Sequence, residues 1–128
     1  ACMHDPLYQA LPDWIDAVLA ASLPDGIAAF HFNLYEGIEF ELQLIGAPIY
    51  LADDDDWACD DIFMSDDPRF ELPRSVVGKA WEMGLAAAND LLARYMSSDR
   101  ARAVRLRQSQ AVSVGFVDGD LQLVWAAD

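Results

Sequence analysis

The densest group of side chains that could do chemistry in this sequence is an acidic segment at residues 53–61. Six carboxylates, an indole and a thiol fall within these nine residues. Contiguous carboxylates attract cations, and tryptophan is enriched where proteins bind one another, so the segment could dock a basic protein. It could equally be a solvated loop whose Trp57 enters the core. The candidate partner-binding residues here are Asp54, Asp55, Asp56, Trp57, Asp60 and Asp61.

Metal binding and catalysis find little support in the residue types. A calcium-binding loop alternates its acids around a glycine and ends on a distal glutamate, whereas the acids here are contiguous and enclose no glycine. The two histidines are His4 and His31, and no Gly-rich phosphate loop, nucleophile elbow or paired-cysteine motif occurs. Carboxylates beside Cys59 disfavour its thiolate, which weakens a Cys59–His31 pair. We therefore expect no metal, no cofactor and no enzymatic activity.

A second polar group follows a region of period two between residues 27 and 45. Phe30, Phe32 and Leu34 alternate with polar residues, and the alternation resumes after Glu36-Gly37, which predicts a β-hairpin with a two-residue turn. The polar face could dock a basic protein, or it could be the solvated side of a sheet. The side chains predicted to share it are His31, Asn33, Tyr35, Glu36, Glu39 and Glu41, of which Tyr35 and the three glutamates are partner-binding candidates.

A group of arginines is the only concentrated positive charge in the chain. Arg100, Arg102, Arg105 and Arg107 fall within eight residues, where they could grip a phosphate. Opposite charges nearby attract strongly, so pairing with the acidic segment is the favoured interpretation. The conformation of residues 97–109 is left open by the sequence.

The acids are concentrated in the first half of the chain. Residues 1–68 contain 15 Asp and Glu and no Lys or Arg, while residues 69–128 contain 7 acids and 8 bases, which gives the net charge of −14. This distribution repels nucleic acid and anionic membranes and attracts cationic proteins. We therefore expect a basic protein partner, with no nucleic acid and no membrane among the partners. Solubility alone is the competing explanation.

The remaining periodicities complete the predicted fold. Helical spacing runs over residues 12–22, with Pro12 in the first turn, and again from about residue 73 or 75 to 96, with a buried stripe that includes Trp81. Residues 49–51 could form a short strand, and residues 53–68 read as a loop. Alternation around Asp118-Gly119 predicts a second hairpin over residues 111–126.

These elements predict one α+β domain spanning residues 1–128. We expect an antiparallel sheet of four or five strands built from the two hairpins. The N-terminal helix and the long central helix should pack on its apolar face. No run of about 18 apolar residues occurs, so no membrane span is expected.

Two stretches resemble small acidic bacterial proteins encoded beside polymorphic or contact-dependent toxins, the toxin-immunity proteins. They are Leu51 to Phe63, with its Asp-Trp-Ala-Cys-Asp-Asp-Ile-Phe core, and Val114 to Leu121. The resemblance implies tight binding and neutralisation of a cognate basic toxin, for example a nuclease. The alternative is a housekeeping or oligomeric structural domain whose acidity is incidental. Two cysteines, Cys2 and Cys59, do not make a disulfide framework, so a reducing cytoplasm is the expected compartment.

Overall fold

The computed structural model of the protein describes residues 5–21, 23–66 and 68–127. Cys2 and His4, named above, and residue 22, the end of the first predicted helix, lie outside these ranges. The elements in chain order are α1 (Asp5–Leu19), β1 (Ala29–Glu36), β2 (Phe40–Ala47), the 3-10 helix η1 (Asp55–Cys59), β3 (Phe63–Met64), β4 (Phe70–Leu72), α2 (Arg74–Val77), α3 (Trp81–Met96), α4 (Ala101–Leu106), β5 (Ala111–Phe116) and β6 (Gln122–Ala126).

The strands form one six-stranded sheet in the order β3-β2-β1-β5-β6, with β4 also paired to β2. Both predicted hairpins exist and join through β1 and β5, so the α+β class is confirmed. The expected purely antiparallel sheet of four or five strands is wrong, because β1 and β5 run parallel in the register Ala29↔Ala111 to Leu34↔Phe116. The helices between the hairpins form the crossover connection that parallel strands require.

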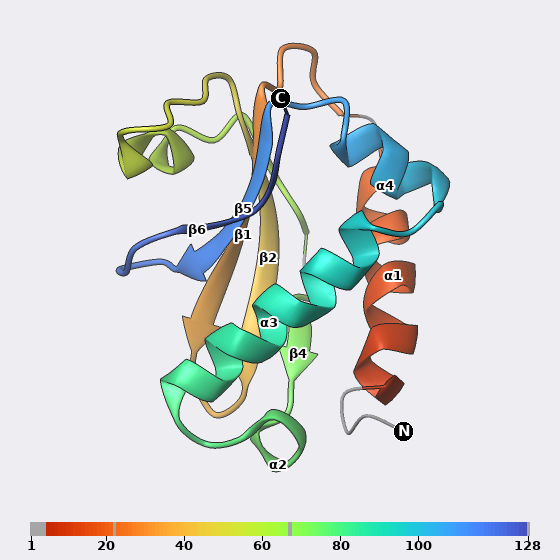
Figure 1. The fold of residues 1–128 in the computed structure, drawn as a ribbon, viewed down its shortest axis with the longest axis vertical. Coiled ribbons are helices and arrows are strands. Elements are labelled where there is room, and N and C mark those ends of the chain that lie inside the picture. Colours follow the sequence, from red (N-terminus) through yellow and green to blue (C-terminus); the bar gives the residue numbers. More distant parts are fainter. Residues whose placement is uncertain (1–4, 22, 67, 128) are drawn as a thin grey trace.

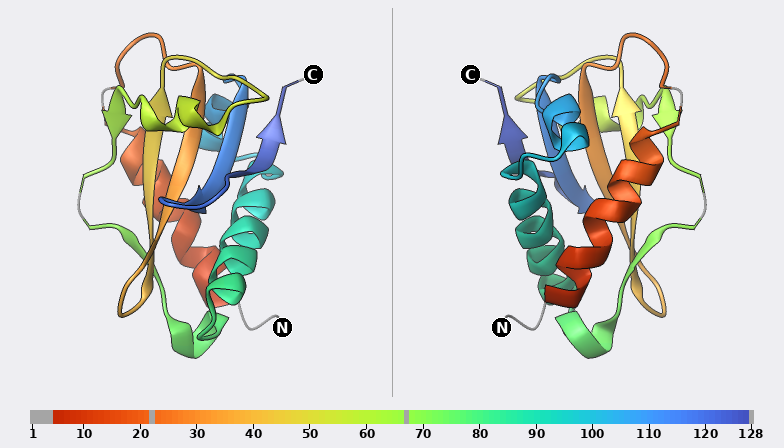
Figure 2. Two further views of the ribbon diagram at one scale, coloured as in Figure 1. Left: turned by 90° about the vertical axis from the view of Figure 1, so that its left-hand side faces the viewer. Right: turned by 90° about the vertical axis from the view of Figure 1, so that its right-hand side faces the viewer.

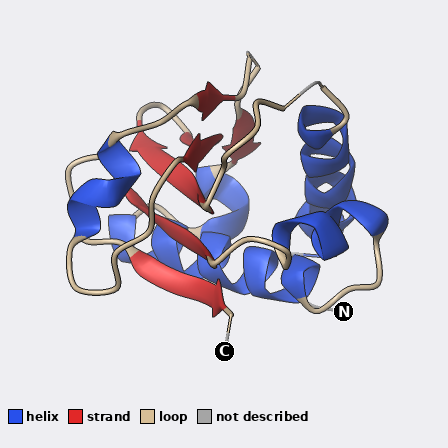
Figure 3. Cartoon of the chain, turned by 90° about the horizontal axis from the view of Figure 1, so that it is seen from above, coloured by secondary structure: helices blue, strands red, loops and turns tan. Residues whose placement is uncertain are grey.

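The helices cover one face of the sheet, and the segment around η1 lies on the other face (Figures 1 and 2). Seen from above, the strands separate η1 from the large helices (Figure 3). Phe30, Phe32 and Leu34 point from β1 into the helical core and are 0% exposed, as their period of two predicted. Within the described residues, no helix is long and apolar enough to cross a membrane.

Both predicted helices differ from the observed ones at their N-terminal ends. The first begins at Asp5, so Pro12 lies inside it and not in its first turn. The second prediction merged two helices: Gly78, with φ of +119°, ends α2, and α3 begins at Trp81. A residue with a Cβ rarely adopts that conformation. The break makes Trp81 the first residue of α3, half exposed, so its predicted burial is wrong.

The rest of the predicted stripe on α3 is buried, apart from Leu85, which is half-buried. Gly84, Ala88, Leu91, Leu92 and Tyr95 are buried, and a Cβ on Gly84 would lie 2.7 Å from the Phe40 ring. A glycine at this position lets α3 approach β2 closely.

The first hairpin turns one residue later than predicted. Its strands end at Glu36 and begin again at Phe40, so Gly37, Ile38 and Glu39 form the connection and Ile38 is 95% exposed. The predicted strand at residues 49–51 is absent, and β2 instead pairs with β3 and β4. The predicted loop at residues 53–68 therefore contains η1 and β3.

Candidate partner-binding surface

The six carboxylates of the acidic segment, which we call the acidic loop, are Asp53, Asp54, Asp55, Asp56, Asp60 and Asp61. All six are exposed. The side chain of Asp54 caps η1 by accepting a hydrogen bond of 3.0 Å from the backbone N–H of Asp56. Asp55 Oδ2 accepts a bond of 3.3 Å from the backbone N–H of Leu121, in the β5–β6 connection. The loop is therefore capped at the N-terminal end of η1 and held there against a neighbouring turn.

Trp57 fixes this loop to the sheet. Its side chain is only 2% exposed, and it meets the Tyr50 ring at 5.3 Å and the His31 ring at 6.3 Å, both edge-on. Small residues of three strands make room for it: Ala29, Ala47 and Ala111. Of the two open alternatives for Trp57, the structure therefore shows the core position. Trp57 positions the carboxylates and does not itself offer a surface to a partner.

The face beneath Trp57 is buried, which corrects the expectation of a solvated polar face. His31 is 4% exposed, Ser113 is 0% exposed, and His31 Nδ1 lies 2.7 Å from Ser113 Oγ. Burial lowers the pKa of His31 from 6.5 to about 4, against the opposing effects of the Asn33 side chain and the negative charge of Asp55. The neutral His31 side chain and the Ser113 hydroxyl thus form a buried polar pair. They lie beside a second, smaller core made by Trp57, Ala29, Ala47 and Ala111.

Cys59, by contrast, is exposed at the end of η1, whereas His31 is covered by Trp57. Among the described residues, no three His, Cys, Asp or Glu side chains are grouped so that they could hold a metal ion.

The other sequence candidates separate to two sides of the first hairpin. Tyr35 pairs with Glu41 across the strands on the face that carries His31, whereas Glu36 pairs with Phe40 on the helical face. Glu36 therefore does not share a face with Tyr35, contrary to the prediction. Glu39 lies in the turn, where its carboxylate accepts a bond of 2.8 Å from the backbone N–H of Arg74. Successive residues of one strand point to opposite faces, and Glu36 is still part of β1, so it alternates with Tyr35 and does not leave the strand at a turn.

Two arginines from the second half of the chain hold the hairpin end. Arg69 Nη1 lies 3.4 Å from Glu41 Oε1, and its guanidinium lies 3.8 Å from the centre of the Tyr35 ring. Arg74 Nη2 lies 3.6 Å from Glu36 Oε2, and its guanidinium lies 4.1 Å from the centre of the Phe40 ring. The chain thus neutralises two of its own candidate carboxylates.

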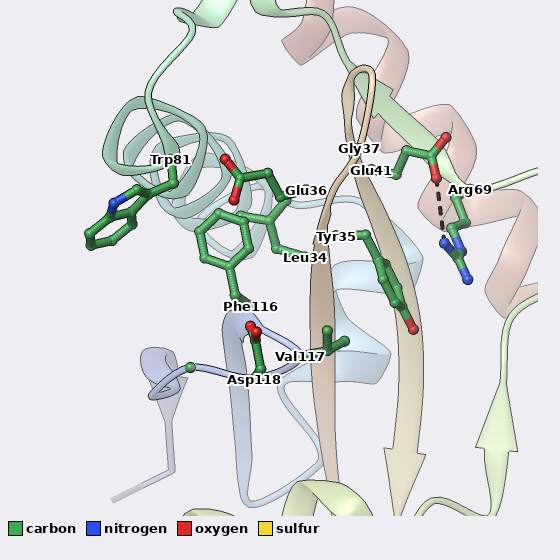
Figure 4. A pocket seen from close by; sticks show the side chains of 11 residues that line it. Leu34, Tyr35, Glu36, Gly37, Glu41, Arg69, Trp81, Phe116, Val117 and Asp118 are labelled. Atoms are coloured by element: carbon green, nitrogen blue, oxygen red, sulfur yellow. Dashed lines mark hydrogen bonds and ion pairs between the residues drawn. The ribbon is translucent and has the colours of Figure 1, made fainter.

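Beside this hairpin end lies an open groove of about 600 Å³. It forms where β5 stops at Phe116, opposite Leu34, while β1 continues to Glu36. Trp81 of α3 and Val117 after β5 are 51% and 54% exposed in it. Figure 4 shows its lining, which we call the hairpin-end groove: Leu34, Tyr35, Glu36, Gly37, Glu41, Arg69, Trp81, Phe116, Val117, Asp118 and Gly119.

The arginine group at residues 100–107 does not pair with the acidic loop, which corrects the favoured interpretation. Arg100 Nη1 lies 2.7 Å from Asp16 Oδ2 and 3.5 Å from Asp13 Oδ1, both on α1. The hydrogen bond to Asp16 raises the pKa of Arg100. Arg107 donates to the backbone carbonyls of Met96 and Ser98, which closes the α3–α4 connection. Arg105 lies over the Phe30 ring at 5.4 Å.

No ion pair between described residues compensates the charge of the acidic loop. Within the described part of the protein, the ion pairs engage Glu36, Glu41, Asp13 and Asp16, and none reaches residues 53–61. Asp118 and Asp120, in the connection that contacts Asp55, are also exposed. Asp120, next to Leu121, therefore adds an exposed carboxylate beside the acidic loop, whereas Asp118 lines the hairpin-end groove.

The sequence did not predict three parts of this surface: the groove itself, the contact of Arg69 with Tyr35 and Glu41, and the place of Asp118 in the groove lining. Gly78 was the available signal, since a helix break there places Trp81 at a helix start. The contacts between Trp81 and Phe116 join residues 35 positions apart, which no local pattern reports.

Comparison of the chain with protein-family models, with curated proteins and with solved structures found no match.

Proposed function

We propose that this protein is a binding inhibitor of the immunity type, which neutralises a basic toxin through the acidic loop. The observation that carries the proposal is that all six carboxylates are exposed, held in place by buried Trp57, and without a basic partner among the described residues. A chain that used these acids for its own stability would pair them, as it pairs Asp16 and Glu41.

The physical reason is that a fixed cluster of like charge accelerates encounter with an opposite charge. Such steering raises association rates and weakens steeply with salt, because the Debye length falls from about 10 Å at 0.1 M to about 3 Å at 1 M. Anchoring by Trp57 also reduces the ordering cost that a mobile acidic tail would pay on binding.

The toxin as partner comes from the sequence resemblance together with the sign of the charge. A basic nuclease has a cationic substrate groove, which a negative surface could cover. The cytoplasm, where such an inhibitor would protect its own cell, is the proposed compartment. Tyr35, Glu36, Glu39 and Glu41 lie at the other end of β1 from the acidic loop and are contacted by Arg69 and Arg74, so we propose them only as a second, partly neutralised contact region.

The direct test compares partner capture and association kinetics for the wild type and the triple variant Asp54→Asn, Asp55→Asn, Asp56→Asn. Asparagine keeps a side-chain oxygen for the cap and the Leu121 contact, so the fold should persist. The matched control is Asp25→Asn, Asp66→Asn, Asp90→Asn, which changes net charge equally at exposed sites elsewhere.

We expect the wild type and the control to capture the same basic protein from native cytoplasm, with an on-rate that falls as salt rises. The acidic-loop variant should bind it more slowly. Equal capture and equal on-rates for all three proteins would refute the acidic-loop proposal, as would partners that are not basic.

An oligomeric structural domain is the second candidate, and one feature favours it. β6 is an edge strand with no charged residue, and Leu123 on it is 51% exposed. Open uncharged edges can pair with a second chain. Light scattering at increasing protein concentration distinguishes the two candidates. A stable oligomer would favour the structural domain, and a monomer would favour the inhibitor.

A further inference from the structure

We propose that the hairpin-end groove binds an arginine side chain of the basic partner, with the exposed Trp81 indole as its platform. The inference rests on the proposed function, and it adds a second contact region with a defined chemistry to the acidic loop. Its basis is the way two of the chain's own arginines, Arg69 in the groove and Arg74 beside it, are bound at this end of the sheet.

The chain already builds two sites of one kind at this end of the sheet. In each, a guanidinium lies over an aromatic ring and beside a glutamate: Arg69 with Tyr35 and Glu41, and Arg74 with Phe40 and Glu36. Cation–π attraction and charge pairing act together in such an arrangement. The local surface is therefore composed to hold guanidinium groups.

A third aromatic and acidic set in the groove has no cation from the described residues. Trp81 and Phe116 meet edge-on at 6.1 Å, and the Trp81 side chain remains 51% exposed. Asp118 lines the same groove and is exposed. In Figure 4, Trp81, Phe116 and Asp118 lie on one side of β1, and Arg69 with Tyr35 lies on the other; Glu36, on the Trp81 side, is already paired with Arg74 and does not belong to the set. The set repeats the composition of the two filled sites.

Arginine fits this set better than lysine does. A planar guanidinium can stack on an indole while its edge donates to a carboxylate, whereas an ammonium is a compact, strongly hydrated charge. The groove volume of about 600 Å³ leaves room for the whole side chain. Glu82, exposed and next to Trp81 in the sequence, lines a neighbouring hollow on the other side of Trp81 and adds negative charge near the platform.

The test uses tetra-arginine as the probe and tetra-citrulline, which keeps the shape but lacks the charge, as its control. The four tryptophans give four indole N–H signals in a nitrogen–proton correlation spectrum, and Trp81→Phe assigns one of them. We expect tetra-arginine to shift the Trp81 indole and the Gly119 amide signals saturably at low salt. Tetra-citrulline should leave them unchanged.

Three variants localise the binding. Trp81→Ala should weaken tetra-arginine affinity at this site about fivefold, the effect of removing an exposed cation–π contact. Asp118→Asn, an exposed change that leaves the fold intact, should weaken it about two- to threefold. Asp25→Asn has the same change of charge near the opposite end of β1 and should have a smaller effect.

An unchanged affinity in both Trp81→Ala and Asp118→Asn overturns the proposal, and so does equal binding of tetra-citrulline. A peptide that shifts only signals of residues 53–61 also overturns it, while leaving the acidic-loop function standing. Conversely, Trp81 shifts that persist in the triple acidic-loop variant, beside unaltered partner kinetics, would support the groove and refute the acidic loop.

Discussion

The buried His31 predicts a specific dependence of stability on pH. The pKa of His31 is about 4 in the folded protein and 6.5 as the ordinary value of an exposed imidazole. Between pH 6.5 and pH 4, His31 is protonated in the unfolded chain but neutral in the folded protein, so lowering the pH favours unfolding. The stabilising contribution is complete above pH 6.5, declines as pH falls, and is lost at about pH 4.

The magnitude follows from the difference of the two pKa values. One pKa unit corresponds to about 1.4 kcal/mol, so a difference of about 2.5 units removes about 3 kcal/mol between pH 6.5 and pH 4. The free energy of unfolding of a single domain is commonly about 5–15 kcal/mol, so this loss is a large share of it. The physical cause is the cover that Trp57 places over His31 and Ser113.

The assay is urea unfolding of the wild type and His31→Gln at half-unit steps from pH 4 to 7.5. Glutamine cannot titrate in this range, and the carboxylates titrate in both proteins, so the difference between the two curves isolates His31. We expect that difference to change by about 1.4 kcal/mol per pH unit within the window and to be flat above pH 7. Parallel curves across the whole range would refute the burial of a neutral His31.

Three further predictions concern packing and charge. Trp57→Ala should lower the free energy of unfolding by about 3–5 kcal/mol, whereas Trp81→Ala should lower it by about 1–2 kcal/mol; similar losses in chemical denaturation would contradict their assigned positions. Gly84→Ala should destabilise by about 1–3 kcal/mol through the Phe40 contact, although helix propensity alone favours alanine, so a stabilised variant would be inconsistent with the close approach of α3. Gly78→Ala should also destabilise by about 1–3 kcal/mol because of its backbone conformation, and an unchanged thermal midpoint would argue that α2 and α3 are one helix.

The candidate surface was predictable in its composition but not in its arrangement. The acidic loop is recognisable from six carboxylates in nine residues, and their exposure follows from the cost of burying unpaired charge. Whether Trp57 faced the core or a partner depended on space between three strands, which Ala29, Ala47 and Ala111 provide. Those alanines are ordinary in sequence and become informative only when the strands are adjacent.

The arginines illustrate the same limit. Arg100 is far from the acidic loop in the sequence, and only the opposite charges of the two segments suggested that they pair. The fold instead brings α1 beside α4, so Asp13 and Asp16 take the guanidinium. Attraction between charges depends on distance in space, which helix packing decides.

The sequence by itself determined the α+β class, both hairpins, the inward face of β1 and the separation of acidic and mixed halves, because these depend on local period and composition. Only the tertiary structure decided that β1 and β5 run parallel, that a second core covers His31, and that Trp81 is exposed beside Phe116. Each of these depends on contacts between segments far apart in the chain. Local patterns show which residues share a face, and packing determines what covers that face.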